Sequence, residues 1–116
     1  MKDVTISHDT ASSILDSLHS LECSIENRML EEMKRVGKII GATAYIEHVD
    51  NWGRWIDGAE DMAAVQAQKG IISDNDRLSV DMAADYLLDC DEAVKNVRSL
   101  QRQLTNAYHY HNKPIY

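Results

Sequence analysis

The sequence has 116 residues, of which 44% are hydrophobic and only one is proline, so it indicates one ordered, largely helical domain over residues 1–116. No apolar run approaches the roughly 18 residues that cross a bilayer, and the first ten residues, MKDVTISHDT, lack the apolar core of a signal peptide. These features exclude a membrane protein and predict a cytoplasmic one, in which Cys23 and Cys90 are reduced, buried thiols.

The formal net charge of −7 is unevenly distributed along the chain. Residues 73–92 contain seven acidic residues and a single basic one, Arg77. Residues 93–116 contain no acidic residue, and their four basic residues are Lys95, Arg98, Arg102 and Lys113. An acidic segment is therefore followed directly by a basic one. Either the two neutralise each other in the fold, or the basic segment binds a polyanion such as nucleic acid.

The N-terminal segment has the pattern of a long amphipathic helix over residues 10–36. Its apolar residues recur at steps of three and four: Ile14, Leu18, Leu21, Ile25, Met29, Met33 and Val36. Asp9 or Thr10 can cap the start of this helix, and Gly37 can end it. We expect the apolar face to pack in the core, and in so small a protein it could also form the seam of a homodimer.

The middle of the chain is less regular. Residues 38–49 fit the periodicity of a strand and of a helix equally well, and we favour a helix because no second convincing strand is present to pair with them. Trp52 and Trp55 are three residues apart, so they share one helical face, and we interpret them as core residues. Gly58 is predicted to weaken or break this helix, and a short helix over residues 59–69 is predicted to end at Gly70.

An acidic helix is predicted over residues 74–90, with Ser73 as its cap and Asp76 three residues later as in a capping box. We assign its buried side to Leu78, Met82, Tyr86, Ala83 and Leu87. Asp81, Asp85 and Asp89 recur every four residues, which places one carboxylate on each turn of an exposed face. This stripe is either a solvated surface or an imitation of a row of phosphates.

A basic helix is predicted over residues 91–110, after a cap at Asp89 or Asp91. Its apolar face is Ala93, Val94, Val97, Leu100, Leu104, Ala107 and Tyr108, and Lys95, Arg98 and Arg102 form a basic stripe opposite. His109 and His111 point in different directions on a helix, and no third ligand is near in sequence, so we predict no metal site. The fold class is therefore all-α, a bundle of four or five helices.

Three motifs follow one another over residues 49–116: WGRW, the helical segment DEAVKNVRSLQRQL, and NAYHYHNKPI. This order resembles phage late-gene transcription antitermination proteins of the Q type, in which a W-x-x-W stretch precedes a helix that leads into a sigma-factor-like helix-turn-helix. The resemblance implies a non-enzymatic regulator that contacts duplex DNA and host RNA polymerase in the host cytoplasm.

The chain departs from that layout at its end, because a base-reading helix would need about 20 more residues than the two that follow Pro114. No base-contacting residue can therefore be transferred from the family. The remaining candidates for contacts with DNA phosphates are Lys95, Arg98, Arg102 and Lys113.

The sequence contains no Gly-rich phosphate loop, no GxSxG motif and no HExxH motif, so we expect neither an enzyme nor a cofactor. The alternative to the antiterminator is a small acidic helical inhibitor, also phage-encoded, that blocks a host protein. In that hypothesis Asp81, Asp85 and Asp89 bind a basic groove on the host protein in place of phosphates. Salt-dependent binding to duplex DNA is expected only of the antiterminator.

Overall fold

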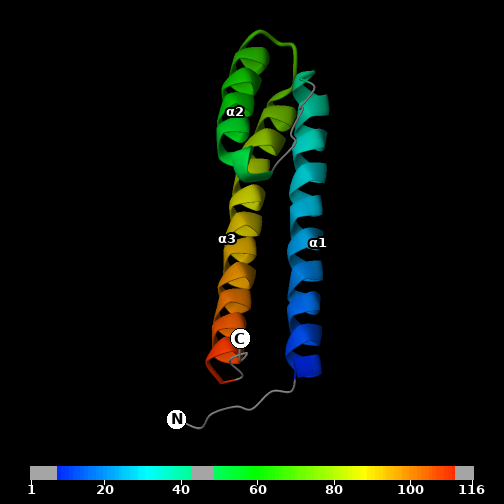
Figure 1. Cartoon of the computed structure of the whole chain (residues 1–116). Helices are drawn as coiled ribbons and strands as arrows, with labels where there is room; N and C mark the ends of the chain where they lie inside the picture. The colour runs from blue at the N-terminus through cyan, green and yellow to red at the C-terminus, as the bar shows by residue number, and fades with distance from the viewer. Residues whose placement is uncertain (1–7, 43–48, 112–116) are drawn as a thin grey trace.

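The computed structural model describes residues 8–42 and 49–111, which form three α-helices and one short 3-10 helix and contain no strand (Figure 1). The elements are α1 (His8–Ile40), η1 (Val49–Asn51), α2 (Trp52–Gln68) and α3 (Asp74–His111). The all-α prediction is confirmed for these residues. The predicted number of four or five helices is wrong, because the described residues form three α-helices.

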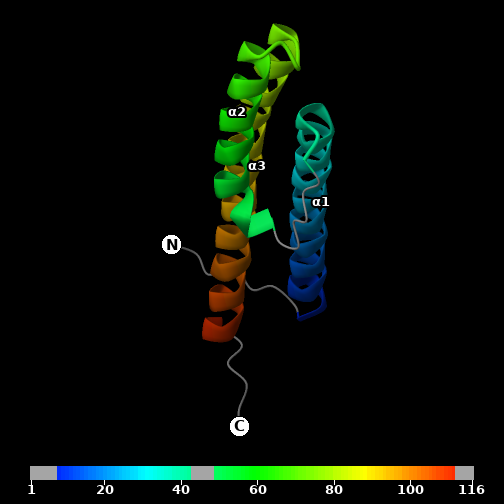
Figure 2. The ribbon, with the colours of Figure 1, turned by 90° about the horizontal axis from the view of Figure 1, so that it is seen from above.

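The helices α1 and α3 lie side by side and run in opposite directions, while α2 packs beside the N-terminal half of α3 (Figures 1 and 2). The molecule therefore has two parts. The first, the three-helix end, consists of α2 with residues 29–40 of α1 and residues 74–94 of α3. The second, the two-helix arm, consists of residues 8–25 of α1 and residues 97–111 of α3, where α2 does not reach.

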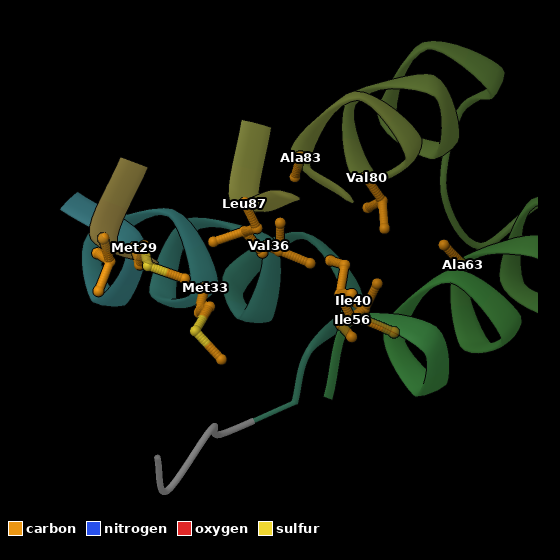
Figure 3. Close-up of a cluster of buried hydrophobic side chains, with 11 residues drawn as sticks. Met29, Met33, Val36, Ile40, Ile56, Ala63, Val80, Ala83 and Leu87 are labelled. Carbon is orange, nitrogen blue, oxygen red and sulfur yellow. The ribbon is translucent and has the colours of Figure 1, made fainter. Parts of the chain in front are cut away.

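The core lies in the three-helix end and takes side chains from all three helices (Figure 3). Its buried members are Met29, Met33, Val36 and Ile40 of α1, Ile56, Ala59 and Ala63 of α2, and Val80, Ala83, Leu87 and Val94 of α3. In the two-helix arm, by contrast, the buried apolar residues among those described are Ala11 and Val97. Since hydrophobic burial provides most of the folding free energy, the three-helix end is the more stable part of the molecule.

The end of α1 differs from the prediction. The helix continues past Gly37 to Ile40, and the residue with a left-handed backbone is Gly41, whose φ is 71°. The amide of Ala42 donates a hydrogen bond of 2.9 Å to the carbonyl oxygen of Gly37, which closes the helix end. At the other end α1 begins at His8, so Asp9 lies inside the first turn instead of capping it.

One predicted helix break is also wrong, whereas two predicted helix ends are confirmed. Gly58 lies within α2, because the cost of about 1 kcal/mol for a helical glycine is smaller than the gain from burying Ile56 and Ala59 on either side of it. The end of α2 is followed by Gly70, whose φ is 73°. The start of α3 is capped by Ser73, whose hydroxyl oxygen accepts a hydrogen bond of 3.1 Å from the Asp76 amide.

The acidic and basic segments form one continuous helix, so the predicted boundary between residues 90 and 91 is wrong. The reason is that the residues turned toward the other helices follow an unbroken repeat of three and four through the boundary: Val80, Ala83, Leu87, Cys90, Val94 and Val97. The same repeat turns Leu78, Met82 and Tyr86 outward, and these residues are exposed instead of buried.

Trp52 and Trp55 are half-buried and pack against the core cluster, so their predicted place in the core is confirmed only in part. Cys23 is exposed and Cys90 is half-buried, and both are free thiols. The prediction of two buried thiols is therefore wrong, most clearly for Cys23.

Candidate binding surfaces

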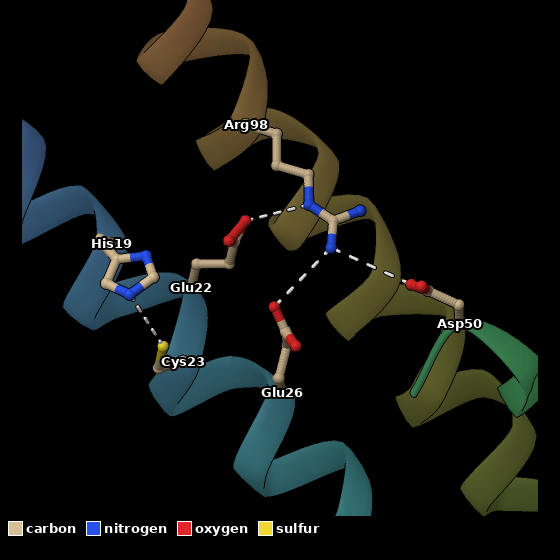
Figure 4. A network of polar contacts seen from close by, with 6 residues as sticks. All are labelled: His19, Glu22, Cys23, Glu26, Asp50 and Arg98. Atoms are coloured by element: carbon tan, nitrogen blue, oxygen red, sulfur yellow. Dashed lines mark hydrogen bonds and ion pairs between the residues drawn. The ribbon is translucent and has the colours of Figure 1, made fainter. Parts of the chain in front are cut away.

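Arg98 of α3 is held by carboxylates from two other elements (Figure 4). Its Nε donates a hydrogen bond of 2.9 Å to Glu22 of α1, and its Nη2 lies 3.7 Å from Glu26 and 4.0 Å from Asp50. The hydrogen bond to Glu22 is the main cause that raises the pKa of Arg98, and the charges of all three carboxylates act in the same direction. Arg98, which the sequence places among the candidates for DNA phosphate contacts, is thus engaged within the protein.

The other predicted basic residues differ from one another in their surroundings. The Lys95 ammonium lies 2.9 Å from the Asp91 carboxylate one turn earlier, although its side chain stays 71% exposed. Arg102 is exposed and forms no ion pair within the described part of the chain. Lys113 lies outside the described residues. The predicted basic stripe is therefore largely neutralised by acidic neighbours, and Arg102 is its one cation in the described residues without an ion pair.

Four carboxylates from two helices meet along the contact between α2 and α3, and we name this the acidic surface: Asp57, Glu60, Asp81 and Asp85. Burial raises the pKa of Glu60, and a hydrogen bond with Asp81 and the charges of Asp81, Asp57 and Asp85 raise it further. None of these four residues forms an ion pair with a basic residue within residues 8–42 and 49–111. The spacing of acidic residues in the sequence predicts the α3 members, Asp81 and Asp85, but not the α2 members, because only tertiary packing brings the two helices together.

Asp89 belongs to a different side of α3. Each step of four residues advances the helix by about 40°, so Asp89 is turned about 80° away from Asp81. Leu88, in contrast, follows Asp81 and Asp85 at helical spacing and is 46% exposed. The acidic surface therefore continues into an exposed apolar side chain, while Asp89 is turned about 40° beyond Asp85, away from α2.

Among the described residues, no group of three or more His, Cys, Asp or Glu side chains is placed to hold a metal ion. None of the helices that these residues form combines the length and the hydropathy that a bilayer crossing requires. Comparisons with protein-family models, with curated proteins and with solved structures find no match to this chain. The resemblance to Q-type antiterminators accordingly rests on the short sequence motifs alone, of which WGRW lies at the start of α2.

Proposed function

We propose that this chain is a non-enzymatic binding protein whose acidic surface docks a basic groove on another protein. The observation that carries the proposal is the meeting of Asp57, Glu60, Asp81 and Asp85 without a paired cation from the residues that the structure describes. Like charges held together destabilise the free protein, and a cationic partner relieves that repulsion on binding. A surface of this kind also steers a basic partner toward the correct orientation.

Leu88 supports a protein partner for this surface. An interface usually combines a charged rim with apolar side chains that become buried at its centre, and Leu88 is an exposed apolar residue next to Asp85. In the phage context that the sequence motifs suggest, the partner would be a host protein that normally binds a polyanion.

A crosslinking experiment tests this proposal. A photoreactive residue at Leu88 should trap a basic protein from host lysate, and Asp85→Lys should lower the crosslinked yield about tenfold, which corresponds to 1.4 kcal/mol. The matched control is Asp16→Lys on α1, because Asp16 is also exposed and forms no ion pair with the described residues, and its replacement changes the net charge equally. Equal effects of the two substitutions, or no effect of either, would contradict the proposal.

The second candidate is the antiterminator-type regulator that contacts duplex DNA and RNA polymerase. The observation in its favour is that Arg102 has no ion pair with any described residue and that the Lys95 side chain remains 71% exposed. Two phosphate contacts predict a log-log salt slope of about −2 for DNA binding.

A gel shift at low salt tests this second candidate, with Arg102→Glu and Lys95→Glu expected to abolish the shifted band. Arg98 is unsuitable for the test because its replacement would leave Glu22 and Glu26 without their cation. Absence of a shift by the parent protein would eliminate the DNA-binding candidate and leave the acidic surface.

A further inference from the structure

One flank of the antiparallel pair α1 and α3 is exposed but rich in apolar side chains. On α1, Ile14 and Leu21 are separated by one heptad, and the same spacing continues to Arg28 and Arg35. On α3, the heptad is Ser79, Tyr86, Ala93 and Leu100, with Met82 beside Tyr86. We name the whole surface along these two heptads the apolar flank, after the large apolar side chains that it exposes. Leu21 is 48% exposed, Leu100 is 52% exposed and Met82 is 62% exposed, although all three are large apolar residues.

The contacts between the helices show that the two heptads run along the same flank. Arg35 donates a hydrogen bond of 2.8 Å to Ser79, and Arg28 lines the same surface depression as Tyr86. Because the helices are antiparallel, the next heptad step places Leu21 level with Ala93, and a further step places Ile14 level with Leu100. The flank is therefore charged and polar at the three-helix end and apolar along the two-helix arm.

The helix α2 lies on the other side of this pair. Trp55 of α2 approaches Gly37 of α1, and Asp50 just before α2 approaches Arg98, which also contacts Glu26. Viewed down the axis of α1, Glu26 and Gly37 are rotated by about 140° and about 160° from Leu21. The buried residues of α1 lie between Leu21 and these two positions. Within the described part of the chain, nothing covers the apolar flank.

We propose that a second copy of this chain covers the apolar flank, with a twofold axis parallel to the helices. Such an axis keeps each residue at its own level and places α1 of one copy over α3 of the other. Ile14 and Leu21 then meet Leu100 and Ala93 of the second copy, so that apolar side chains face apolar side chains. The two-helix arms together form a four-helix arrangement, in which each arm obtains the burial that it lacks alone.

Charge complementarity supports a second copy as the occupant. Under the same symmetry, Arg28 of one copy lies over Asp89 of the other, which is exposed one turn from Tyr86. Neither Arg28 nor Asp89 forms an ion pair within residues 8–42 and 49–111. The contact occurs twice in the dimer, and each pair joins opposite charges.

The size of the flank is also sufficient for a stable dimer. From Ile14 to Arg35 the flank covers 21 residue steps of α1, which is about 32 Å, and it is about 20 Å wide across the two helices. This is about 640 Å² for each partner and about 1,300 Å² in total, within the roughly 1,200–2,000 Å² that specific interfaces bury. The flank is on a different side of α3 from the acidic surface, so the dimer goes beyond the proposed function and can fail independently of it.

Analytical ultracentrifugation over a concentration series tests the dimer. The parent should dimerise, and Leu21→Glu with Leu100→Glu should raise the dissociation constant at least about 100-fold while circular dichroism stays helical, because both residues are exposed in the single chain. Val65→Glu is the control, since Val65 is 49% exposed on α2 and lies outside the flank. A parent that is monomeric at about 100 µM, or a dimer that survives Leu21→Glu and Leu100→Glu, would overturn the proposal.

A mixing experiment identifies the partner as a second copy in this orientation. Arg28→Glu and Asp89→Arg should each weaken the homodimer about tenfold, since each places like charges together in two exposed contacts. Mixing the two variant chains should restore association, because both symmetric contacts of the mixed dimer then join opposite charges. Mixed chains that associate no better than either variant alone would refute this arrangement. That result is also the one expected if the flank binds an unrelated protein instead of a second copy.

Discussion

The role assigned to Arg98 from the sequence differs from the role that it has in the fold. In sequence it belongs to a basic stripe, and its nearest acidic partner in space, Glu22, is 76 residues away. The guanidinium joins α1, the segment before α2, and α3 at the level where the three-helix end becomes the two-helix arm. No local pattern predicts such a contact, because it depends on the antiparallel register of two long helices. Arg98 therefore contributes to holding the helices together, and fewer cations remain for phosphates than the sequence suggests.

Glu60 should make the stability of the protein depend on pH. Its pKa in the folded protein is raised by burial and by Asp81, so between the unfolded and folded pKa values the folded chain binds more protons than the unfolded chain. The contribution of Glu60 to the free energy of unfolding should therefore rise as the pH falls through its folded pKa toward the ordinary glutamate value of 4.5, and fall as the pH rises through the folded pKa. Chemical denaturation at several pH values measures this effect.

The variant Glu60→Gln isolates the contribution of that carboxyl. At about pH 7 it should raise the free energy of unfolding by roughly 0.5 kcal/mol, the size of repulsion between like charges on helices, and the gain on acidification should shrink. Asp16→Asn removes the same charge outside the acidic surface and serves as the control. If the two variants showed the same pH profile, the carboxylates of the acidic surface would not be coupled as the structure has them.

At the scale of helices, sequence patterns predict type well and boundaries poorly. The cap at Ser73 and the stop at Gly70 were predictable because both act through their own backbone neighbourhood. Gly37 and Gly41 are one turn apart and equally suitable as helix ends, and the choice depends on packing, since Gly37 is buried against Trp55. Asp89 and Asp91 can cap a helix or lie within one, and the continuing apolar repeat decides in favour of one long α3.

Two glycines should therefore respond in opposite ways to the same substitution. Gly58→Ala should raise the free energy of unfolding by about 1 kcal/mol, because Gly58 is exposed inside α2 and an added Cβ meets nothing within 4 Å. Gly37→Ala should lower it, although the helix propensity gain is the same, because its Cβ would lie 2.7 Å from the carbonyl oxygen of Ala42. Thermal and urea unfolding measure both changes. Shifts of the same sign would contradict either the open surroundings of Gly58 or the close contact between Gly37 and Ala42.

At the scale of the whole molecule, the uneven length of the helices determines where stability and exposed surface lie. The helix α2 has 17 residues against 33 in α1 and 38 in α3, so it can cover only part of the pair. The acidic surface lies where α2 meets α3, and the apolar flank lies on the side that α2 does not touch. The sequence predicted long amphipathic helices but not this division, because coverage depends on where a short helix docks along two longer ones.

This division predicts a gradient of amide hydrogen exchange along α1 and α3. In the monomeric variant with Leu21→Glu and Leu100→Glu, amides at residues 29–40 and 80–94 should exchange only through global unfolding, since they surround the core. Amides at residues 10–25 and 97–107 should exchange faster through local separation of the arm, because two helices without a third bury too little apolar surface to resist opening. In the parent, raising the protein concentration should slow exchange in the arm, since a second copy that binds only the closed arm stabilises it by mass action. Uniform protection along both helices of the monomeric variant would show that the arm is stable by itself. Stabilisation of the arm could then no longer explain why a second copy binds the apolar flank.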